Sequence, residues 1–148
     1  METSKEGKDF IKAREGLELV VYKDDAGFAT IGYGHMFQKH EEPVEVISEE
    51  EADRLFEEDC QKAELCVSDA CKTVALQQHE FDALVSFTFN VGCGAFRSST
   101  LLRELLASRP VAAAEQFKRW VYAGGKVNKG LAARRRMERH LFITGEYL

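Results

Sequence analysis

The hydrophobic residues near the start of the chain are spaced as on a short helix. Thr3-x-x-Glu6 has the form of a capping box, which predicts the start of a helix. Gly16 is well placed to end this helix, because glycine adopts the left-handed backbone conformations found just past a helix end. The predicted helix carries Phe10, Ile11 and Arg14.

The pattern then changes to one that is typical of a β-hairpin. Leu19–Lys23 is predicted to form a strand, and residues 24–27 (Asp-Asp-Ala-Gly) have turn chemistry. Residues 28–34 are predicted to return as a second strand, interrupted by Gly32 and Gly34. Glycines inside a strand often mark a bend, or a close approach of another group to the backbone.

The remainder of the chain has a helical pattern. Ser48-x-x-Glu51 is a second capping box, and the apolar positions after it have helical spacing. Residues 77–91 are apolar on nearly every side, which predicts a buried central helix that Gly92 would end. Three further helices are expected at residues 99–107, from Pro110 through Trp120, and at residues 128–143.

Composition supports a compact, mostly helical protein. The chain has 148 residues, 45% of them hydrophobic, with ten phenylalanines and two prolines. We expect a single α+β domain over residues 1–148, with a small N-terminal lobe (about 1–60) that holds the hairpin and a helical lobe (about 61–148). The first residues are polar, and no segment resembles a signal peptide or a membrane span, so we expect synthesis in a cytoplasm and no membrane partner.

The net charge of −5 conceals an asymmetry along the chain. Residues 1–93 carry 9 basic and 21 acidic side chains, whereas residues 94–148 carry 11 basic and 4 acidic ones. The basic C-terminal part is suited to an anionic polymer, and both nucleic acid and cell wall have that charge.

The four cysteines match no metal-binding pattern. Cys60, Cys66, Cys71 and Cys93 include no Cys-x-x-Cys pair, so no metal site or cofactor is expected. Our first interpretation is that they are small buried thiols. A disulfide among the first three is the alternative.

Two carboxylic acids lie in contrasting local environments. Glu15 is at the predicted C-terminal end of the first helix, where the helix dipole disfavours a negative charge, and Asp24 is in a polar turn. Glycoside hydrolysis needs two carboxyl groups in different protonation states. On spacing alone, however, the two are better explained as ordinary surface acids.

Three motifs give these residues a stronger interpretation. The first is Glu15-x8-Asp24-x5-Thr30, continued by Ile-Gly-Tyr-Gly-His up to His35. The second is the segment 81–102, and the third comprises the Gly-Gly-Lys of residues 124–126 and the later Gly-Leu and triple-arginine sequences. Together they closely resemble phage-type lysozymes, the glycoside hydrolases of family 24 that include lambdoid phage endolysins. The resemblance covers roughly residues 6–145.

This resemblance implies a lysozyme-like fold with a cleft between the two lobes, and bacterial peptidoglycan as the substrate. It implies that Glu15 is the general acid, that Asp24 orients a water molecule and balances positive charge, and that Thr30 holds that water. The expected reaction is an inverting hydrolysis of the β-1,4 bond between N-acetylmuramic acid and N-acetylglucosamine. Gly32 and Tyr33 belong to the same motif and are expected to support the site.

Four other residues receive roles from the resemblance. Asn90 would face the cleft, although it is equally well explained as a helix-terminal asparagine. Arg134 would reach toward Glu15, although a solvated basic face is the alternative for each arginine of this helix. His35 and Asp59 are expected to form a structural ion pair, because Asp59 alone on an apolar helix face would be costly. The acidic residues of 41–51 are expected to be solvated.

Competing functions are an inactive wall-binding module and a nucleic-acid-binding protein. Intact Glu15, Asp24 and Thr30 argue against the first, and the acidic first part of the chain argues against the second. We expect a monomer that stays in the host cytoplasm until a holin releases it to the cell wall. A bacterial toxin domain with the same chemistry is the alternative setting.

Overall fold

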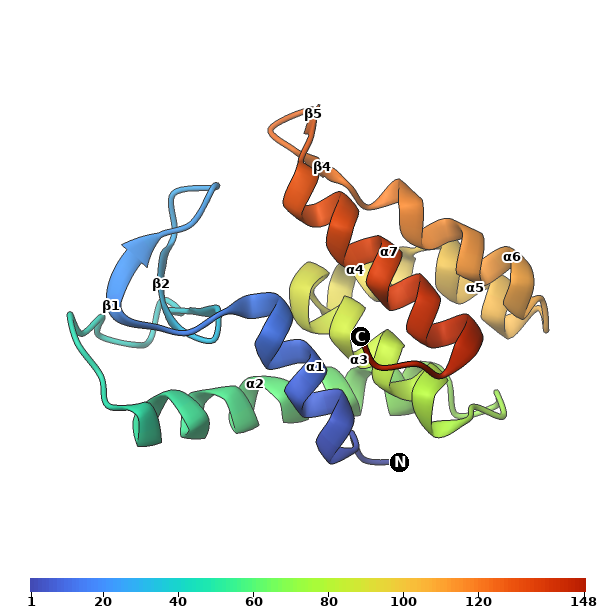
Figure 1. Cartoon of the computed structure of the whole chain (residues 1–148), viewed down its shortest axis with the longest axis horizontal. Helices are drawn as coiled ribbons and strands as arrows, with labels where there is room; N and C mark the ends of the chain where they lie inside the picture. The colour runs from blue at the N-terminus through green and yellow to red at the C-terminus, as the bar shows by residue number, and fades with distance from the viewer.

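The computed structural model describes residues 1–148 and has the expected α+β, mostly helical architecture. Figure 1 shows a small sheet at one end, a group of helices at the other, and α2 extending beneath both. The elements are α1 (Lys5–Glu15), β1 (Glu18–Lys23), β2 (Ala29–Gly32), β3 (His35–Met36), α2 (Glu49–Ala70), α3 (Gln78–Val91), α4 (Cys93–Ser98), α5 (Thr100–Leu106), α6 (Pro110–Gln116), a 3₁₀ turn (Phe117–Arg119), β4 (Tyr122–Ala123), β5 (Lys126–Val127) and α7 (Lys129–Thr144). The boundary expected near residue 60 falls inside α2.

Helix α1 begins one residue later than the capping pattern indicates. Ser4 is the N-cap, and its hydroxyl accepts a hydrogen bond from the Gly7 N–H at 3.0 Å. Thr3 is instead buried, and its N–H donates to Glu64 of α2. The helix ends at Gly16, as predicted, with φ of +74° and with Glu15 as its last residue.

The hairpin has the predicted first strand and turn, but its second strand is divided. In the β1–β2 pairing Tyr22 lies opposite Thr30, with an irregularity between Glu18 and Tyr22. The chain turns again after Gly32 and forms β3, where His35 pairs with Ile31. The sheet therefore has three strands in the order β1-β2-β3 rather than two.

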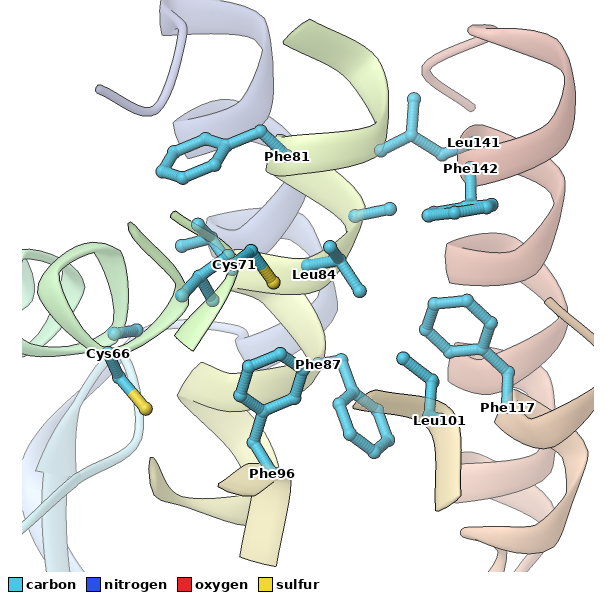
Figure 2. Close-up of a cluster of buried hydrophobic side chains, with 14 of the residues drawn as sticks. Cys66, Cys71, Phe81, Leu84, Phe87, Phe96, Leu101, Phe117, Leu141 and Phe142 are labelled. Carbon is cyan, nitrogen blue, oxygen red and sulfur yellow. The ribbon is translucent and has the colours of Figure 1, made fainter. Parts of the chain in front are cut away.

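Helix α3 is the centre of the core, as its all-round apolar sequence predicts. It packs against α1, α2, α4 and α7. Phe87 lies between Phe96 and Phe117 (Figure 2), with ring centroids 6.4 and 5.5 Å away. Trp120 also packs edge-on against Phe87, at 5.4 Å. Gly92 ends α3, as expected.

Three short elements are absent from the sequence prediction. These are α4, which follows Gly92 directly, and the hairpin of β4 and β5, which lies beyond the N-terminal end of α7 in Figure 1. The helix that starts at Pro110 also ends at Gln116, so the prediction that it includes Trp120 is wrong. The last helix starts after Asn128 and ends at Gly145, in left-handed conformation.

The cysteine interpretation needs a correction. Cys66 of α2 and Cys93 of α4 form a disulfide, so these two are not free thiols. The alternative of a disulfide among the first three cysteines is also wrong, because it did not include Cys93. Cys60 and Cys71 are buried free thiols, as expected, and burial raises the pKa of each to about 11. A thiol with such a pKa is a poor nucleophile near neutral pH.

No group of three or more histidine, cysteine or acidic side chains is arranged to hold a metal ion. None of the helices is both long and apolar enough to cross a bilayer.

Candidate active site

Glu15 is held at the end of α1 by contacts on both sides of its carboxyl group. Arg134 Nη1 donates to Glu15 Oε2 at 2.5 Å, so the structure brings these two predicted residues together. On the other side, a Cβ placed on Gly34 would overlap Glu15 Oε1. Gly34 has φ of +75°, a conformation that other residues rarely adopt. Glycine at this position therefore lets the turn before β3 lie directly against the carboxyl group.

Arg134 belongs to a buried network with equal numbers of positive and negative groups. Its Nε donates to Glu138 Oε2 at 3.1 Å, and its Nη2 donates to the Ser86 carbonyl at 3.0 Å. Arg135 donates to the other oxygen of Glu138. Burial opposes the charge of Arg134, but Glu15 and Glu138 outweigh it, so the pKa of Arg134 is raised. The guanidinium therefore remains a fixed cation beside Glu15.

Asn90 lies beside Arg135 rather than Arg134. Its Oδ1 accepts a hydrogen bond from Arg135 Nη2, while Arg135 Nε donates to the Trp120 carbonyl at 2.9 Å. The residue is otherwise exposed at the end of α3. Contact between Asn90 and substrate stays a prediction.

Asp24 and Thr30 lie on the same face of the β1–β2 hairpin. Thr30 is directly opposite Tyr22, and Asp24 is two residues beyond Tyr22, so the two side chains are diagonal neighbours. Asp24 Oδ1 accepts the N–H groups of Ala26 at 3.0 Å and Phe28 at 2.8 Å. These bonds fix the carboxylate while leaving Oδ2 without a protein donor.

The Thr30 hydroxyl is also oriented by the backbone. Its side chain is buried, and Oγ1 donates its proton to the Phe28 carbonyl at 2.9 Å. The oxygen lone pairs therefore remain available to accept a hydrogen bond.

Tyr22 indicates that the hairpin face and the end of α1 share one electrostatic environment. Burial raises the pKa of Tyr22, and the negative charges of Glu15, Glu18 and Asp24 raise it further. The phenol therefore lies within electrostatic reach of both candidate catalytic acids. Sequence reasoning did not single it out.

Gly32 and Tyr33 have mainly inward contacts. Gly32 is buried with φ of +69° and packs against Ala52 of α2. The Tyr33 ring lies edge-on to Phe56, with centroids 5.7 Å apart, and Lys12 Nζ is 5.0 Å from the Tyr33 centroid. These contacts join the hairpin to α1 and α2; a role in substrate binding stays a prediction.

His35 bridges two carboxylates. Its Nδ1 lies 2.7 Å from Asp59 Oδ2, which is the expected pair, and its Nε2 lies 2.9 Å from Glu41 Oε2. The prediction that Glu41 is solvated is therefore wrong. Its carboxylate contacts His35 because the second ring nitrogen of a buried histidine needs a hydrogen-bond partner. The hydrogen bond to Asp59 is the largest cause of a raised pKa at His35.

A pocket of about 310 Å³ opens between the small sheet, α2 and the end of α3. Gly34, which contacts Glu15, forms part of its wall, together with Met36 after the turn and Phe89 near the end of α3. The hollow is thus located where the two lobes meet, and Gly34 separates it from Glu15, which is not one of its lining residues.

We expect His35→Asn to lower the free energy of unfolding by about 1–3 kcal/mol, because it removes the link between two partly buried carboxylates. The raised pKa sets the pH dependence. The stabilisation that protonated His35 provides is fully present below 6.5, the pKa of histidine in the unfolded chain. It is lost as the pH rises through the higher pKa that His35 has in the folded protein. Denaturant unfolding at pH 6 and pH 9 measures this difference.

The matched control is His40→Asn, which makes the same change at an exposed histidine nearby. A His35→Asn variant as stable as the His40→Asn variant at pH 6 would show that the bridge contributes nothing.

The fold and this arrangement of groups define a lysozyme-like protein: an acid at the end of the first helix, a hairpin with aspartate and threonine, and a helical second lobe. The family model described as phage lysozyme matches residues 12–138. The chain belongs to the phage lysozyme family.

Relatives and solved structures agree with this assignment. The endolysin of Salmonella phage P22 is 39% identical, over 97% of this chain and 99% of its own length. The endolysin from Escherichia coli O157:H7 phage FAHEc1 superimposes with a TM-score of 0.88 at 38% identity, covering 100% of this chain and 97% of that one. The muramidase domain of SpmX from Asticaccaulis excentricus gives a TM-score of 0.85 at 34% identity, covering 97% of this chain and 98% of that one.

The endolysin of Bacillus phage B103 is 46% identical over 99% of this chain but only 56% of its own length. The chain thus spans about half the length of this curated relative.

Proposed function

We propose that this chain is a muramidase that hydrolyses the glycan strands of bacterial peptidoglycan. The observation that carries the proposal is the placement of Glu15, which Arg134 holds at the end of α1 and which lies against Gly34, a residue of the pocket wall. Relatives that are named endolysin and muramidase support it. The proposed cleavage is at the β-1,4 bond from N-acetylmuramic acid to N-acetylglucosamine.

Glu15 is the proposed general acid. Arg134 occupies Oε2, whereas Oε1 lies beside Gly34 without a protein donor. Oε1 is therefore the oxygen that is free to carry the proton and give it to the leaving glycosidic oxygen. Gly34, against which this oxygen lies, also forms part of the pocket wall.

Asp24 and Thr30 are the proposed water-binding pair. Asp24 Oδ2 and Thr30 Oγ1 are both acceptors, and one water molecule between them would donate both of its hydrogens. Its lone pair would then point away from the hairpin, toward the anomeric carbon. This geometry suits inversion, which requires about 6.5–9.5 Å between the two carboxyl groups.

Analysis of the products tests the proposal. Digestion of purified peptidoglycan should create new reducing ends on N-acetylmuramic acid, detected by borohydride reduction and mass spectrometry. NMR of a soluble fragment, recorded before the anomers equilibrate, should show the α-anomer first if the reaction inverts a β-bond.

Other products would lead to other conclusions. Anhydro ends would identify a lytic transglycosylase, and reducing N-acetylglucosamine would identify a glucosaminidase. A first-formed β-anomer would contradict inversion while leaving hydrolysis intact.

Relatives that are named endolysins support the proposal that the chain acts on the cell wall during host lysis. Release from the cytoplasm by a holin and a monomeric state are further parts of the proposal, and the names of the relatives do not bear on them.

A further inference from the structure

The disulfide between Cys66 and Cys93 has one buried end and one exposed end. Cys66 lies in α2 and is 4% exposed, whereas Cys93 is the first residue of α4 and is exposed to solvent. The proposed glycan hydrolysis uses neither sulfur atom. A small thiol or disulfide in solution would therefore approach this bond from the side of Cys93.

A cation lies beside the sulfur of Cys93. Arg97 Nε donates to Cys93 Sγ at 3.3 Å, and Arg97 Nη2 donates to Asp69 Oδ2 of α2 at 2.8 Å. Because Cys93 and Arg97 are four residues apart on the same helix, the guanidinium would stay near this sulfur if the disulfide opened. A neighbouring arginine favours the thiolate, which is the form of cysteine that attacks other sulfur atoms.

The other two cysteines have the opposite properties. Cys60 and Cys71 are both buried, and burial raises the pKa of each thiol to about 11. Buried thiols with such pKa values react slowly near neutral pH. The chain therefore contains its own reference thiols, with which the reactivity of Cys93 can be compared.

We propose that Cys66 and Cys93 form a reversible redox site, in which Cys93 is the attacking thiol and Cys66 is the thiol that closes the bond. The partner in the reaction is a disulfide-bearing oxidant such as glutathione disulfide. The proposal goes beyond the proposed function, because it concerns the covalent state of the protein and not its substrate.

The oxidation proceeds in two thiol–disulfide exchange steps. The Cys93 thiolate attacks one sulfur of the oxidant, which forms a mixed disulfide and releases one glutathione thiolate. Cys66 then loses its proton to solvent and attacks the Cys93 sulfur, which closes the protein disulfide and releases the second glutathione. Two protein thiols are oxidised and one external disulfide is reduced to two thiols. An excess of glutathione reverses both steps.

The bond controls how firmly α4 is joined to α2. When it is open, the ion pair of Arg97 with Asp69 still joins the two helices, but the side chains of this pair are 48% and 60% exposed. Exposed ion pairs contribute little to stability. The oxidised protein should therefore be the more stable form. Reducing compartments keep thiols open, whereas the outside of a cell permits disulfides, so the two forms belong to different locations.

Pulse alkylation of the reduced wild-type protein tests the reactivity of Cys93. The protein is reduced with a phosphine, freed of it, exposed briefly to iodoacetamide at pH 7, and analysed by peptide mass spectrometry. Cys93 should be labelled at least about tenfold faster than Cys60 and Cys71. Addition of glutathione disulfide in place of iodoacetamide should re-form the Cys66–Cys93 bond and release two glutathione molecules per chain.

A pair of variants separates the charge of Arg97 from the ion pair that it makes. Arg97→Gln removes the cation, and labelling of Cys93 should slow by about three- to tenfold. Asp69→Asn is the matched control, because it breaks the same ion pair but leaves the guanidinium beside the sulfur. Its labelling should be as fast as in the wild type or faster.

The thermal stability of the two redox forms completes the test. The reduced wild-type protein should have a Tm lower by roughly 4–15 °C than the oxidised one, as expected for the loss of one disulfide. Both forms should release reducing ends from a soluble glycan fragment at the same rate at room temperature, because the bond holds none of the proposed catalytic residues.

The possible failures can be told apart. Labelling of Cys93 no faster than that of Cys60 and Cys71 would overturn its role as the attacking thiol, as would equal slowing in Arg97→Gln and Asp69→Asn. If glutathione disulfide does not re-form the bond, the site is not reversible. Equal Tm values would refute the stabilising role. None of these results bears on glycan cleavage, whose failure would appear as an absence of new reducing ends with both redox forms.

Discussion

Glu15→Gln is expected to reduce the rate of glycan cleavage by about 10³- to 10⁴-fold, because it removes the proton that the leaving oxygen needs. Glutamine keeps the shape of the side chain and can still accept the hydrogen bond from Arg134. The measurement is the release of reducing ends from purified peptidoglycan.

The same substitution should change the free energy of unfolding by no more than about 1 kcal/mol. Removing a negative charge from the C-terminal end of α1 is favourable by about 0.3–1 kcal/mol. Losing the ion pair with Arg134 is unfavourable by a similar amount, since that guanidinium keeps Glu138 and the Ser86 carbonyl as partners.

Glu18→Gln is the matched control, because it removes an exposed acid three residues further on. It should retain wild-type activity within about threefold. A folded Glu15→Gln protein that cleaves peptidoglycan at the wild-type rate would overturn the assignment of the acid and the mechanism with it.

Glu138→Gln should have the largest effect on stability, lowering the free energy of unfolding by about 3–5 kcal/mol. Glu138 is completely buried and accepts from Arg134, from Arg135 and from the Ser86 hydroxyl, the last at 2.6 Å. Glutamine would leave the buried Arg135 without any carboxylate partner and Arg134 with Glu15 alone, whereas Glu15→Gln leaves Glu138 to both arginines. Thermal unfolding should show a fall in Tm of roughly 6–20 °C.

Glu115→Gln is the control for this variant. Glu115 of α6 pairs with Arg139 of α7, the helix that also carries Glu138, but both side chains of this pair are more than 40% exposed. Its replacement should therefore cost no more than about 1 kcal/mol. Equal losses for the two variants would show that the buried network is not a structural requirement.

Glu138 also connects stability to the candidate chemistry. It does not touch the pocket, yet it positions Arg134, which in turn holds Glu15 Oε2. The folded fraction of Glu138→Gln should therefore also show reduced cleavage.

The local sequence was sufficient to place both candidate catalytic acids on their elements. Gly16 ends α1 and makes Glu15 its last residue, and the turn residues after β1 place Asp24 at a hairpin tip. Helix α3 was likewise predictable, because fourteen residues contain several helical repeats of an apolar pattern. The six-residue α4 and the two-residue strands β4 and β5 are too short to show a period.

The choice of partners depended on the tertiary structure. With 20 basic and 25 acidic side chains, the sequence does not say which of two adjacent arginines meets Glu15, nor that Glu41 joins His35 and Asp59. The packing of α7 against α3 and the end of α1 directs Arg134 to Glu15 and Arg135 to Asn90. The disulfide between Cys66 and Cys93, which are 27 residues apart in the sequence, likewise depends on how distant elements pack together. Capping, turns and periodicity act between residues a few positions apart, and so can be seen in the sequence. Ion pairs, disulfides and the approach of Gly34 to Glu15 arise only where distant elements cross.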